Sequence, residues 1–552
     1  MRKLYLGIDV GTGSVRVGAF DAKGRMQGKG EHPIKIWRPA ANFVEQSSED
    51  IWKATAKAVH TCLVSGRLSP KSVQGLSFDA TCSLVALGND LRPITVSPTK
   101  KTNQNVIVWM DHRATREAAI INVTRHPVLR YVGGKISPEM EPPKLMWLKK
   151  NLKRTWKNAS KFMDLADYMV YRATGSDLRS LCTTVCKWTY LGHEGENGHY
   201  RLKFFEKIGI SDLFHAERVP LESHPMGKVA GGLNKKAAKD FGLHSGVSVG
   251  VGIIDAHAGG IGSLGPVLKD DKYKKEPFDH AIALIGGTSS CHMAVSCEAR
   301  FINGVWGPYY SAMIPGMWLN EGGQSATGSL IDYMIKNNSS YPGIAKAAKS
   351  EGTDVYAFLN RLVGKIKKKQ GLSVFSKIHM LPYHHGNRSP RADPLARGMI
   401  SGLTLQSTLE EVALWYAATI QAIAYGTRHI IEAMNKKGYN IEKIYLSGGH
   451  LKNSLFIQEH ADITGCRVII PKEPEAVLLG TAMLGAVAAG EYPDLVSAMR
   501  SMCKIDKVFV PNPKTFHVHG ERYSIFKKMY RFQKQIHKQM ESITQKKEKH
   551  NE

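Results

Sequence analysis

Cysteine is scarce in this chain of 552 residues, which has eight. They are spread over the whole length, unlike the dense framework of a small disulfide-stapled domain. Cys182 and Cys186 have a CxxxC spacing, but no partner pair with the spacing of a zinc site follows. We therefore expect all eight to be free thiols.

Long hydrophobic runs are also missing. The most apolar long stretch, residues 412–424, contains Gln421 and is too short to cross a bilayer. The N-terminus does not follow the pattern of a signal peptide, because Asp9 and a glycine-rich turn come directly after Leu6. These absences predict a cytoplasmic protein without membrane insertion.

Acidic residues are outnumbered by basic ones, 48 against 75, which gives a net charge of +27. Such an excess attracts anions, including nucleic acids and phosphate ligands. The basic clusters at 149–161, 361–369 and 527–549 lack the interleaved aromatic residues of a nucleic-acid surface. We interpret them as solvated helix faces and expect no specific nucleic-acid partner.

The 43% of hydrophobic residues is enough for sizeable cores, and their pattern favours an α/β architecture. Apolar strands are predicted at 3–9, 15–20, 75–78, 247–254, 281–285, 292–296 and 443–447. Helices are predicted at 48–63, 113–124, 143–152, 163–174, 408–434 and 474–489. We expect an N-terminal lobe at 1–265, a C-terminal lobe at 266–515 and a basic helical tail at 516–552.

Glycine-rich turns follow apolar strands at four places, residues 11–14, 286–290, 322–323 and 448–449. Glycine lets backbone N–H groups approach a phosphate, although turns between strands also need it for positive φ. The chain has no GxxxxGK[ST] motif and no GxGxxG motif after its first strand, which excludes a P-loop or Rossmann site. Several such turns in both halves favour a nucleotide site of another kind.

Acidic residues at strand ends are candidates for the chemistry. Asp9 ends the first strand, where a carboxylate holds Mg²⁺ directly or through water, or else caps the turn. Asp255 follows an apolar strand and precedes small residues, which suits a base or a helix N-cap, with His257 as an alternative base. Asp111 and Arg113 offer hydrogen-bonding groups for hydroxyls, or else cap a helix start.

Together these motifs resemble the FGGY carbohydrate kinases over most of the chain, from Leu6 to about Gly490. The matching segments are 7–16, 253–257, 285–290, 448–449 with Asn453, and 480–482. Longer runs resemble the pentulose kinases closest to D-ribulokinase, at 78–83, 109–114, 137–145 and 321–328. The match is partial at 398–421, and the 269–276 loop and the basic tail look like additions.

The resemblance implies an α/β, two-lobed actin/hexokinase/Hsp70-like (ribonuclease H-like) fold with the active site in a cleft between the lobes. It implies an ATP-dependent carbohydrate kinase that uses Mg²⁺ with ATP and phosphorylates the C5 hydroxyl of a ketopentose, D-ribulose first. D-Xylulose, L-ribulose and ribitol are the alternative substrates, and a nucleotide-dependent binding ATPase on the same fold is the alternative class. A homo-oligomer is left open.

The resemblance also assigns roles to residues of this chain. Asp255 is the expected catalytic base, and Asp9 the expected Mg²⁺ ligand. The sugar site is expected to include Ala80, Asp111, Lys187, Asp255 and Glu321. The ATP site is expected to include Gly11, Thr12, Gly13, Ser14, Gly287, Thr288, Ser289, Gln324, Gly448, Gly449 and Asn453.

Overall fold

The computed structural model describes residues 2–196, 198–215, 217–270, 272 and 276–548. Part of the 269–276 loop and the last four residues of the predicted tail lie outside the described residues. The chain forms two compact units. The first comprises Met1–Asp279, Met293–Asn320 and Pro471–Lys504, and the second comprises His280–His292, Glu321–Ile470 and Ile505–Glu552.

The central sheet of the first unit confirms the predicted alternation of strands and helices. Its path runs β3-β2-β1-β5-β10-β9, with β11 paired to β5. The strands are β1 (Leu4–Val10), β2 (Ser14–Phe20), β3 (Met26–Pro33), β5 (Val73–Ala80), β9 (Val229–Gly232), β10 (Ser248–Gly250) and β11 (Ile253–Ile254). Every residue of β1 is buried, because this strand lies inside the sheet.

The helices of the first unit include α1, whose N-cap is Ser47. They are α1 (Ser48–Ser65), α2 (Thr115–Val123), α3 (Glu141–Asn151), α4 (Lys153–Asn158), α5 (Leu165–Thr174), α6 (Leu181–Lys187), α7 (Leu202–Lys207), α8 (Asp212–His215), α9 (Lys235–Phe241), α10 (Asp255–Leu264), α16 (Ala476–Ala488) and α17 (Leu495–Met502). A smaller sheet in the order β4-β7-β6-β8 lies in the same unit. Its strands are β4 (Glu45–Gln46), β6 (Leu84–Gly88), β7 (Val106–Ile107) and β8 (Ala159–Asp164).

Helix α16 belongs to the first unit although it comes from the C-terminal part of the chain. Glycines allow it to approach α10 and β1 at backbone distance. A Cβ at Gly262 would lie 1.9 Å from the Ala476 carbonyl oxygen, and one at Gly480 would lie 2.0 Å from the Ala258 carbonyl oxygen. Only glycine fits at these crossings, so the helix pair is fixed by its small residues.

The second seven-stranded sheet has the order β14-β15-β13-β12-β18-β19-β20, and β16 pairs with β17. The strands are β12 (Ala281–Gly286), β13 (Ser290–Ser296), β14 (Trp306–Tyr310), β15 (Trp318–Gln324), β16 (His379–Leu381), β17 (Met399–Ser401), β18 (Lys443–Gly448), β19 (Arg467–Pro471) and β20 (Ile505–Phe509). The helices of the second unit are α11 (Gly328–Lys336), α12 (Tyr341–Ser350), α13 (Val355–Gln370), α14 (Leu409–Asn435), α15 (Ser454–Thr464) and α18 (Phe516–Glu548).

One predicted glycine turn is wrong. Gly322 and Gly323 lie inside strand β15 and not in a turn after a strand. A Cβ at Gly322 would lie 2.8 Å from the side chain of Ile430, and one at Gly323 would lie 2.9 Å from that of Arg388. These glycines therefore serve close packing within a strand.

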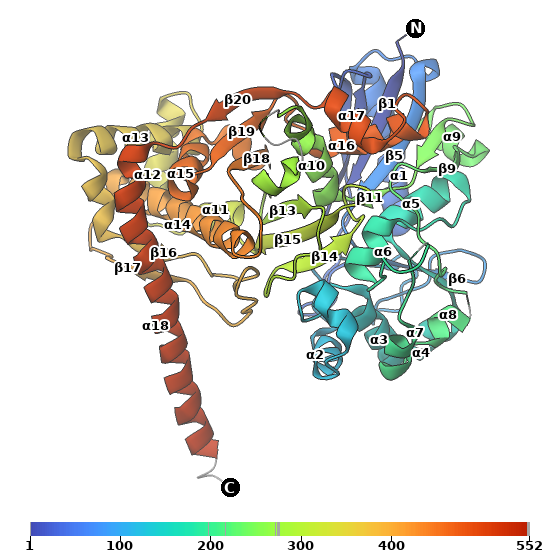
Figure 1. Cartoon of the computed structure of the whole chain (residues 1–552), viewed down its shortest axis with the longest axis horizontal. Coiled ribbons are helices and arrows are strands. Elements are labelled where there is room, and N and C mark those ends of the chain that lie inside the picture. The colour runs from blue at the N-terminus through green and yellow to red at the C-terminus, as the bar shows by residue number, and fades with distance from the viewer. Residues whose placement is uncertain (1, 197, 216, 271, 273–275, 549–552) are drawn as a thin grey trace. The chain divides into compact units, whose positions relative to one another are not determined.

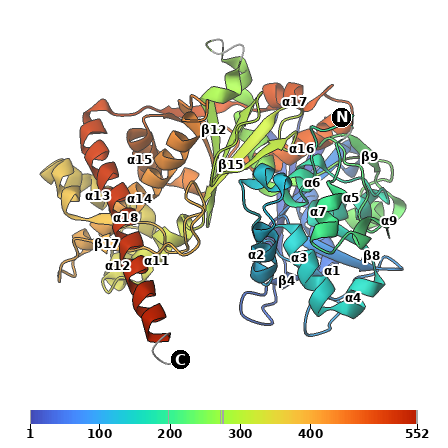
Figure 2. The same ribbon diagram turned by 60° about the horizontal axis from the view of Figure 1, so that its bottom comes forward.

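The basic C-terminal segment is one helix, α18, through Glu548. Its first half packs on the second unit through Tyr523, Phe526 and Met529, which share a core cluster with Tyr425 of α14. In both ribbon views α18 then continues beyond the other elements of this unit (Figures 1 and 2). The helix is thus anchored at its start by aromatic packing.

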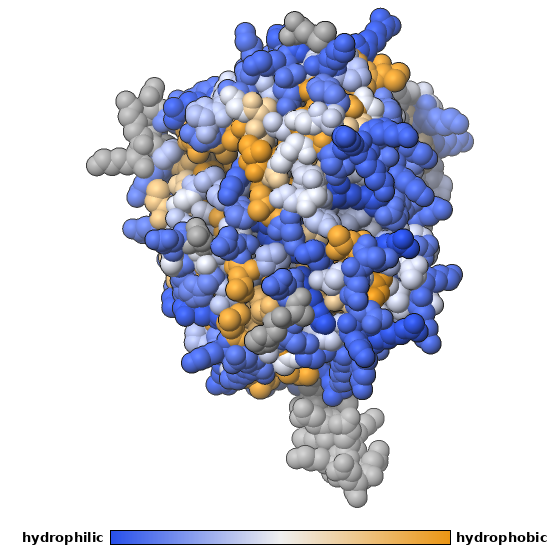
Figure 3. Space-filling model, turned by 90° about the vertical axis from the view of Figure 1, so that its right-hand side faces the viewer, coloured by the Kyte–Doolittle hydropathy of each residue, from blue (hydrophilic) through white to orange (hydrophobic). Residues whose placement is uncertain are grey.

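No helix in the described parts of the chain combines the length and apolarity that crossing a membrane requires. Hydrophilic residues predominate on the face drawn in Figure 3, with hydrophobic ones in separate patches. All eight cysteines are free thiols, as the sequence predicts.

Candidate active site

Three aspartates meet at the carboxyl edge of the central sheet in the first unit. Parallel pairing places Asp9 of β1 opposite Asp79 of β5, and Asp79 opposite Ile253 of β11. Asp255 is the first residue of α10, two positions after Ile253. Because parallel strands end at the same edge, these carboxylates share one region, where open α/β sheets bind ligands.

Asp9 and Asp79 are neighbouring acidic residues on adjacent strands. Asp79 is fully buried, and burial together with the negative charge of Asp9 raises the pKa of Asp79 well above its ordinary range. The hydroxyl of Thr481 on α16 donates to one oxygen of Asp79, and the guanidinium of Arg16 pairs with Asp9. The other oxygen of Asp79 has no hydrogen-bond partner among the described residues. This orphaned oxygen beside a second carboxylate suits a shared proton or a hard cation.

Asp255 has the properties of a base held near neutral pH. Burial and the negative charge of Asp9 raise the pKa of Asp255 to about 6. The Ala256 N–H donates to Asp255 Oδ1 at 2.7 Å, and the Lys187 ammonium acts in the same direction, favouring the ionised form. The carboxylate is half-buried, so it is both shielded and reachable. Such a group is ionised at pH 7 and accepts a proton readily.

The other predicted sugar-site residues of this unit lie nearby in the fold. Ala80 is buried at the end of β5, opposite Ile254, one residue before Asp255. Lys187 ends α6, and its ammonium lies 4.8 Å from the ring centre of Trp306. The charge of Lys187 also acts on Glu141, a buried carboxyl whose pKa burial raises to about 7. The structure thus brings Ala80, Lys187 and Asp255 together.

Asp111 is held by the chain itself. Its carboxylate accepts from the Val44 N–H at 2.6 Å and from the backbone and side chain of Arg113 at 2.7–3.0 Å. Arg113 also donates to Glu45 at 2.8 Å. Four donors fill the acceptor capacity of a carboxylate. The contact between Asp111 and a sugar therefore stays a prediction, and the visible role of Asp111 is to fix the segment after β7.

The first glycine-rich turn joins the antiparallel strands β1 and β2, which confirms the two predicted strands on either side of it. The Trp109 indole N–H donates to the Thr12 hydroxyl at 3.0 Å, the Gln46 amide donates to the Thr12 carbonyl at 2.7 Å, and the Ser14 hydroxyl donates to Glu31 at 2.8 Å. A Cβ at Gly13 would meet no other atom of the described structure within 4 Å. The turn is held from one side and open at Gly13, as a phosphate loop requires.

The second turn joins β12 to β13 in the second unit. Its carbonyl groups at Gly287 and Thr288 accept backbone N–H groups from Gly328, Thr327 and Ser329 at 2.9–3.2 Å. The start of α11 therefore fixes the orientation of this loop. A Cβ at Gly287 would meet a single atom, 3.9 Å away, so this loop also has an open face. Ser289 lies in the same turn.

Gly448 ends β18 beside this loop, with φ of +88°. A Cβ there would lie 2.3 Å from the Gly286 carbonyl oxygen, so the two turns pack directly together. Gly449 begins the short helix that follows. Asn453 caps α15 by accepting from the Phe456 N–H at 3.1 Å, and its amide donates to Tyr416 at 2.8 Å.

Two further residues of the second unit already have partners. Gln324 donates to the Ile423 carbonyl at 3.0 Å and to Thr427 at 3.1 Å, which packs β15 on α14. Glu321 accepts from the Arg388 guanidinium at 2.8 Å. Their contacts with ATP and sugar stay predictions.

The sequence reasoning missed Arg16 and Thr481 as site residues, and it gave no specific role to Asp79, which it placed in a polar cluster just past a strand end. Each lies inside a segment that the resemblance matches, but nothing in the sequence shows that Asp79 faces Asp9 or that Thr481 reaches it. The only signal was position. Asp79 follows an apolar strand, as Asp9 and Asp255 do. Because β5 pairs in parallel with both β1 and β11, the three aspartates lie at the same edge of the sheet.

Comparison with models of protein families identifies the family of this chain. The model for the N-terminal domain of the FGGY family of carbohydrate kinases matches residues 4–262, and the model for its C-terminal domain matches residues 282–489. The chain belongs to the FGGY family of carbohydrate kinases, and it is an ATP-dependent carbohydrate kinase.

Relatives of known name cover most of the chain. An FGGY carbohydrate kinase domain-containing protein of Xenopus laevis is 46% identical over 96% of this chain and 97% of its own length. The D-ribulokinase of Saccharomyces cerevisiae is 38% identical over 89% of this chain and 72% of its own length. The crystal structure of xylulose kinase from Rhodospirillum rubrum has a TM-score of 0.73 at 18% identity, covering 96% of this chain and 99% of that one. This likeness confirms the two-domain α/β fold of the sugar kinases.

Proposed function

We propose that this kinase transfers the γ-phosphoryl group of ATP to the C5 hydroxyl of a ketopentose, with D-ribulose as the preferred substrate. The observation that carries the proposal is Asp255, a half-buried carboxylate with a pKa raised to about 6 at the ligand-binding edge of the sheet. The 38% identity to a D-ribulokinase supports the choice of sugar.

In the proposed step, the Asp255 carboxylate accepts the proton of the C5 hydroxyl while that oxygen attacks the γ-phosphorus. The new O–P bond forms as the bond to the β–γ bridging oxygen breaks, and ADP leaves with that electron pair. A positioned base contributes roughly 10²–10⁴-fold, and orientation of the reactants supplies much of the rest. Lys187 and Ala80 are the proposed neighbours of the sugar, and Glu321 and Asp111 its further contacts.

The proposed phosphate-binding groups are the two glycine-rich turns, residues 11–14 and 287–289. Their carbonyl groups are engaged by the chain, while a Cβ at Gly13 or Gly287 would meet almost nothing in the described structure. Gly448, Gly449 and Asn453 are the proposed adenosine contacts, with Gln324 supporting them from β15.

We propose that Asp9 and Asp79 hold Mg²⁺. The orphaned oxygen of Asp79 beside Asp9 gives oxygen donors of the kind this cation prefers. When bound, Mg²⁺ supplies neutralisation of the charge on the phosphates. Arg16, which pairs with both Asp9 and Glu475, keeps the carboxylate of Asp9 in place.

The test is a panel of sugars in a coupled assay of ADP formation. D-Ribulose, D-xylulose, L-ribulose and ribitol are compared by kcat/KM with a matched Asp255→Asn variant. We expect D-ribulose to lead by at least tenfold, and the variant to lose activity with every sugar. A higher kcat/KM for another sugar would overturn the D-ribulose assignment. ADP formation that does not depend on any sugar would overturn the kinase step and favour a binding ATPase.

A further inference from the structure

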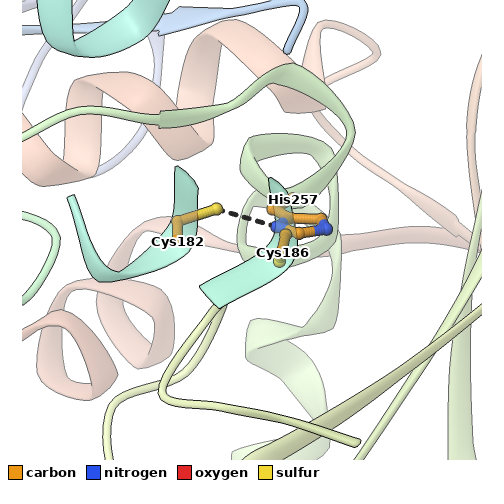
Figure 4. A group of neighbouring side chains, drawn as sticks. All are labelled: Cys182, Cys186 and His257. Carbon is orange, nitrogen blue, oxygen red and sulfur yellow. Dashed lines mark hydrogen bonds between the residues drawn. The ribbon is translucent and has the colours of Figure 1, made fainter. Parts of the chain in front are cut away.

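Helices α6 and α10 bring three metal-ligating side chains to one point inside the first unit. Cys182 and Cys186 lie on α6, and His257 lies on α10 (Figure 4). The Cys182 sulfur is 2.9 Å from His257 Nδ1, and one ligand atom from each residue lies within 4.8 Å of the others. Residues four apart share a helix face, which places both cysteine side chains close to His257. The third ligand of the CxxxC pair therefore comes from another helix, 75 positions after Cys182.

The site is enclosed by protein. Relative exposure is 0% for Cys182, 1% for Cys186 and 1% for His257. The Ile254 N–H approaches the Cys182 sulfur at 3.5 Å, a backbone contact of the kind that orients thiolate ligands. Buried ligands are pre-ordered, so the cost of organising them is met by the fold and not by the ion.

The dimensions fit a small tetrahedral ion. With bonds of about 2.3 Å to sulfur and about 2.0 Å to nitrogen, two such ligands lie about 3.5 Å apart. Cys182 and His257, now 2.9 Å apart, need to separate by about half an ångström. The three ligand atoms lie within 4.8 Å of one another, so the wider part of the set has to contract around the ion.

The net charge of the three ligands favours Zn²⁺ over Cu⁺. Two thiolates and a neutral imidazole carry two negative charges, which Zn²⁺ cancels and Cu⁺ leaves half uncompensated. A residual negative charge is costly in this region, because all three ligand side chains are buried. Sulfur and imidazole ligands are those that Zn²⁺ prefers.

We propose that Cys182, Cys186 and His257 bind one Zn²⁺ ion, with a water molecule as the fourth ligand. The ion ties the end of α6 to the start of α10. Lys187 follows Cys186 directly, and Asp255 precedes His257 by two residues. The ion therefore fixes the positions of the Lys187 ammonium and the Asp255 carboxylate. It touches neither substrate.

The experiment uses the full-length protein, reduced with a phosphine, stripped with EDTA and then given CoCl₂ or ZnCl₂ without sugar or nucleotide. We expect one equivalent of metal to remain after gel filtration, and a thiolate-to-cobalt charge-transfer band. Cys186→Ser should reduce that band by about half. Cys182→Ser, Cys186→Ser and His257→Asn should each weaken Zn²⁺ binding about 100-fold or more, since even outer-shell changes cost 10–100-fold.

Cys62→Ser is the matched control, because Cys62 is also fully buried in the first unit, on α1, and is far along the chain from the three ligands. It should keep both the band and the affinity. Folding is checked by the metal-free urea transition, and Zn²⁺ should raise the midpoint of the parent and of Cys62→Ser but not of Cys186→Ser. Metal binding without the thiolate band, or equal loss in Cys62→Ser, would overturn the proposal. So would a disulfide between Cys182 and Cys186 in the purified protein, detected by mass spectrometry as the loss of two hydrogens.

Discussion

Replacing Asp255 by asparagine tests the electrostatics of the first unit most directly. Burial and Asp9 raise the pKa of Asp255 to about 6, from an ordinary value of 3.8. Each pKa unit corresponds to about 1.4 kcal/mol, so ionising this group in the folded state costs about 3 kcal/mol. Because the side chain is half-buried, solvent screening reduces this to about 1–2 kcal/mol.

The sign follows from which state binds the proton more tightly. The folded state does so here, so the parent loses stability as the pH rises from about 4 through 6. Asparagine is neutral at every pH and keeps an oxygen acceptor for the Ala256 N–H. Asp255→Asn should therefore be more stable than the parent by about 1–2 kcal/mol at pH 8, and by about half as much at pH 5. Its kcat should fall by roughly 10²–10⁴-fold.

The assay is urea unfolding followed by circular dichroism at pH 5 and pH 8, with kcat measured at pH 8. Asp21→Asn is the control of opposite sign. Burial opposes ionisation of Asp21, but the Arg25 N–H and guanidinium outweigh it and hold the Asp21 pKa below its ordinary value. That variant should lose stability at pH 8. An Asp255→Asn protein that is less stable than the parent at pH 8, or whose difference does not change with pH, would refute the reasoning.

Three further substitutions probe the packing and the loops around the site. A Cβ at Gly7 would lie 2.0 Å from the Leu478 carbonyl oxygen, so Gly7→Ala should destabilise the fold by about 3 kcal/mol or more. Gly13 has open space around it, so Gly13→Ala should unfold at the parent's urea midpoint and raise the KM for ATP. Asp111→Asn removes one carboxylate from the buried Arg113 and should cost about 3 kcal/mol in urea unfolding. A normal unfolding midpoint with a raised sugar KM alone would instead make Asp111 a substrate ligand.

Local signals predicted the elements that local chemistry determines. The hairpin of β1 and β2 follows from two apolar runs around a glycine-rich turn, and α1 starts where Ser47 offers an N-cap. Asp255 is a candidate base because it directly follows an apolar strand. In each case the deciding interaction lies within a few residues of sequence.

Interactions between distant segments escaped the same reasoning. The pair Gly322-Gly323 has the composition of a turn, and only the neighbouring Ile430 and Arg388 explain its place inside β15. The two lobes expected at 1–265 and 266–515, and the tail expected at 516–552, stay predictions. The compact first unit extends to Asp279 and also takes up 293–320 and 471–504, which no composition change marks.

The acidic edge of the first unit depends on the most distant of these segments. Thr481 donates to Asp79 across 402 positions, and Glu475 pairs with Arg16 across 459. Asp79 sits between Asp9 and Asp255, so a helix from the end of the chain stabilises carboxylates that would otherwise repel one another. Closing loops of this length costs conformational entropy, which these contacts and the packing of α16 offset. The acidic edge of the first unit is therefore complete only when α16 is docked against β1 and β5.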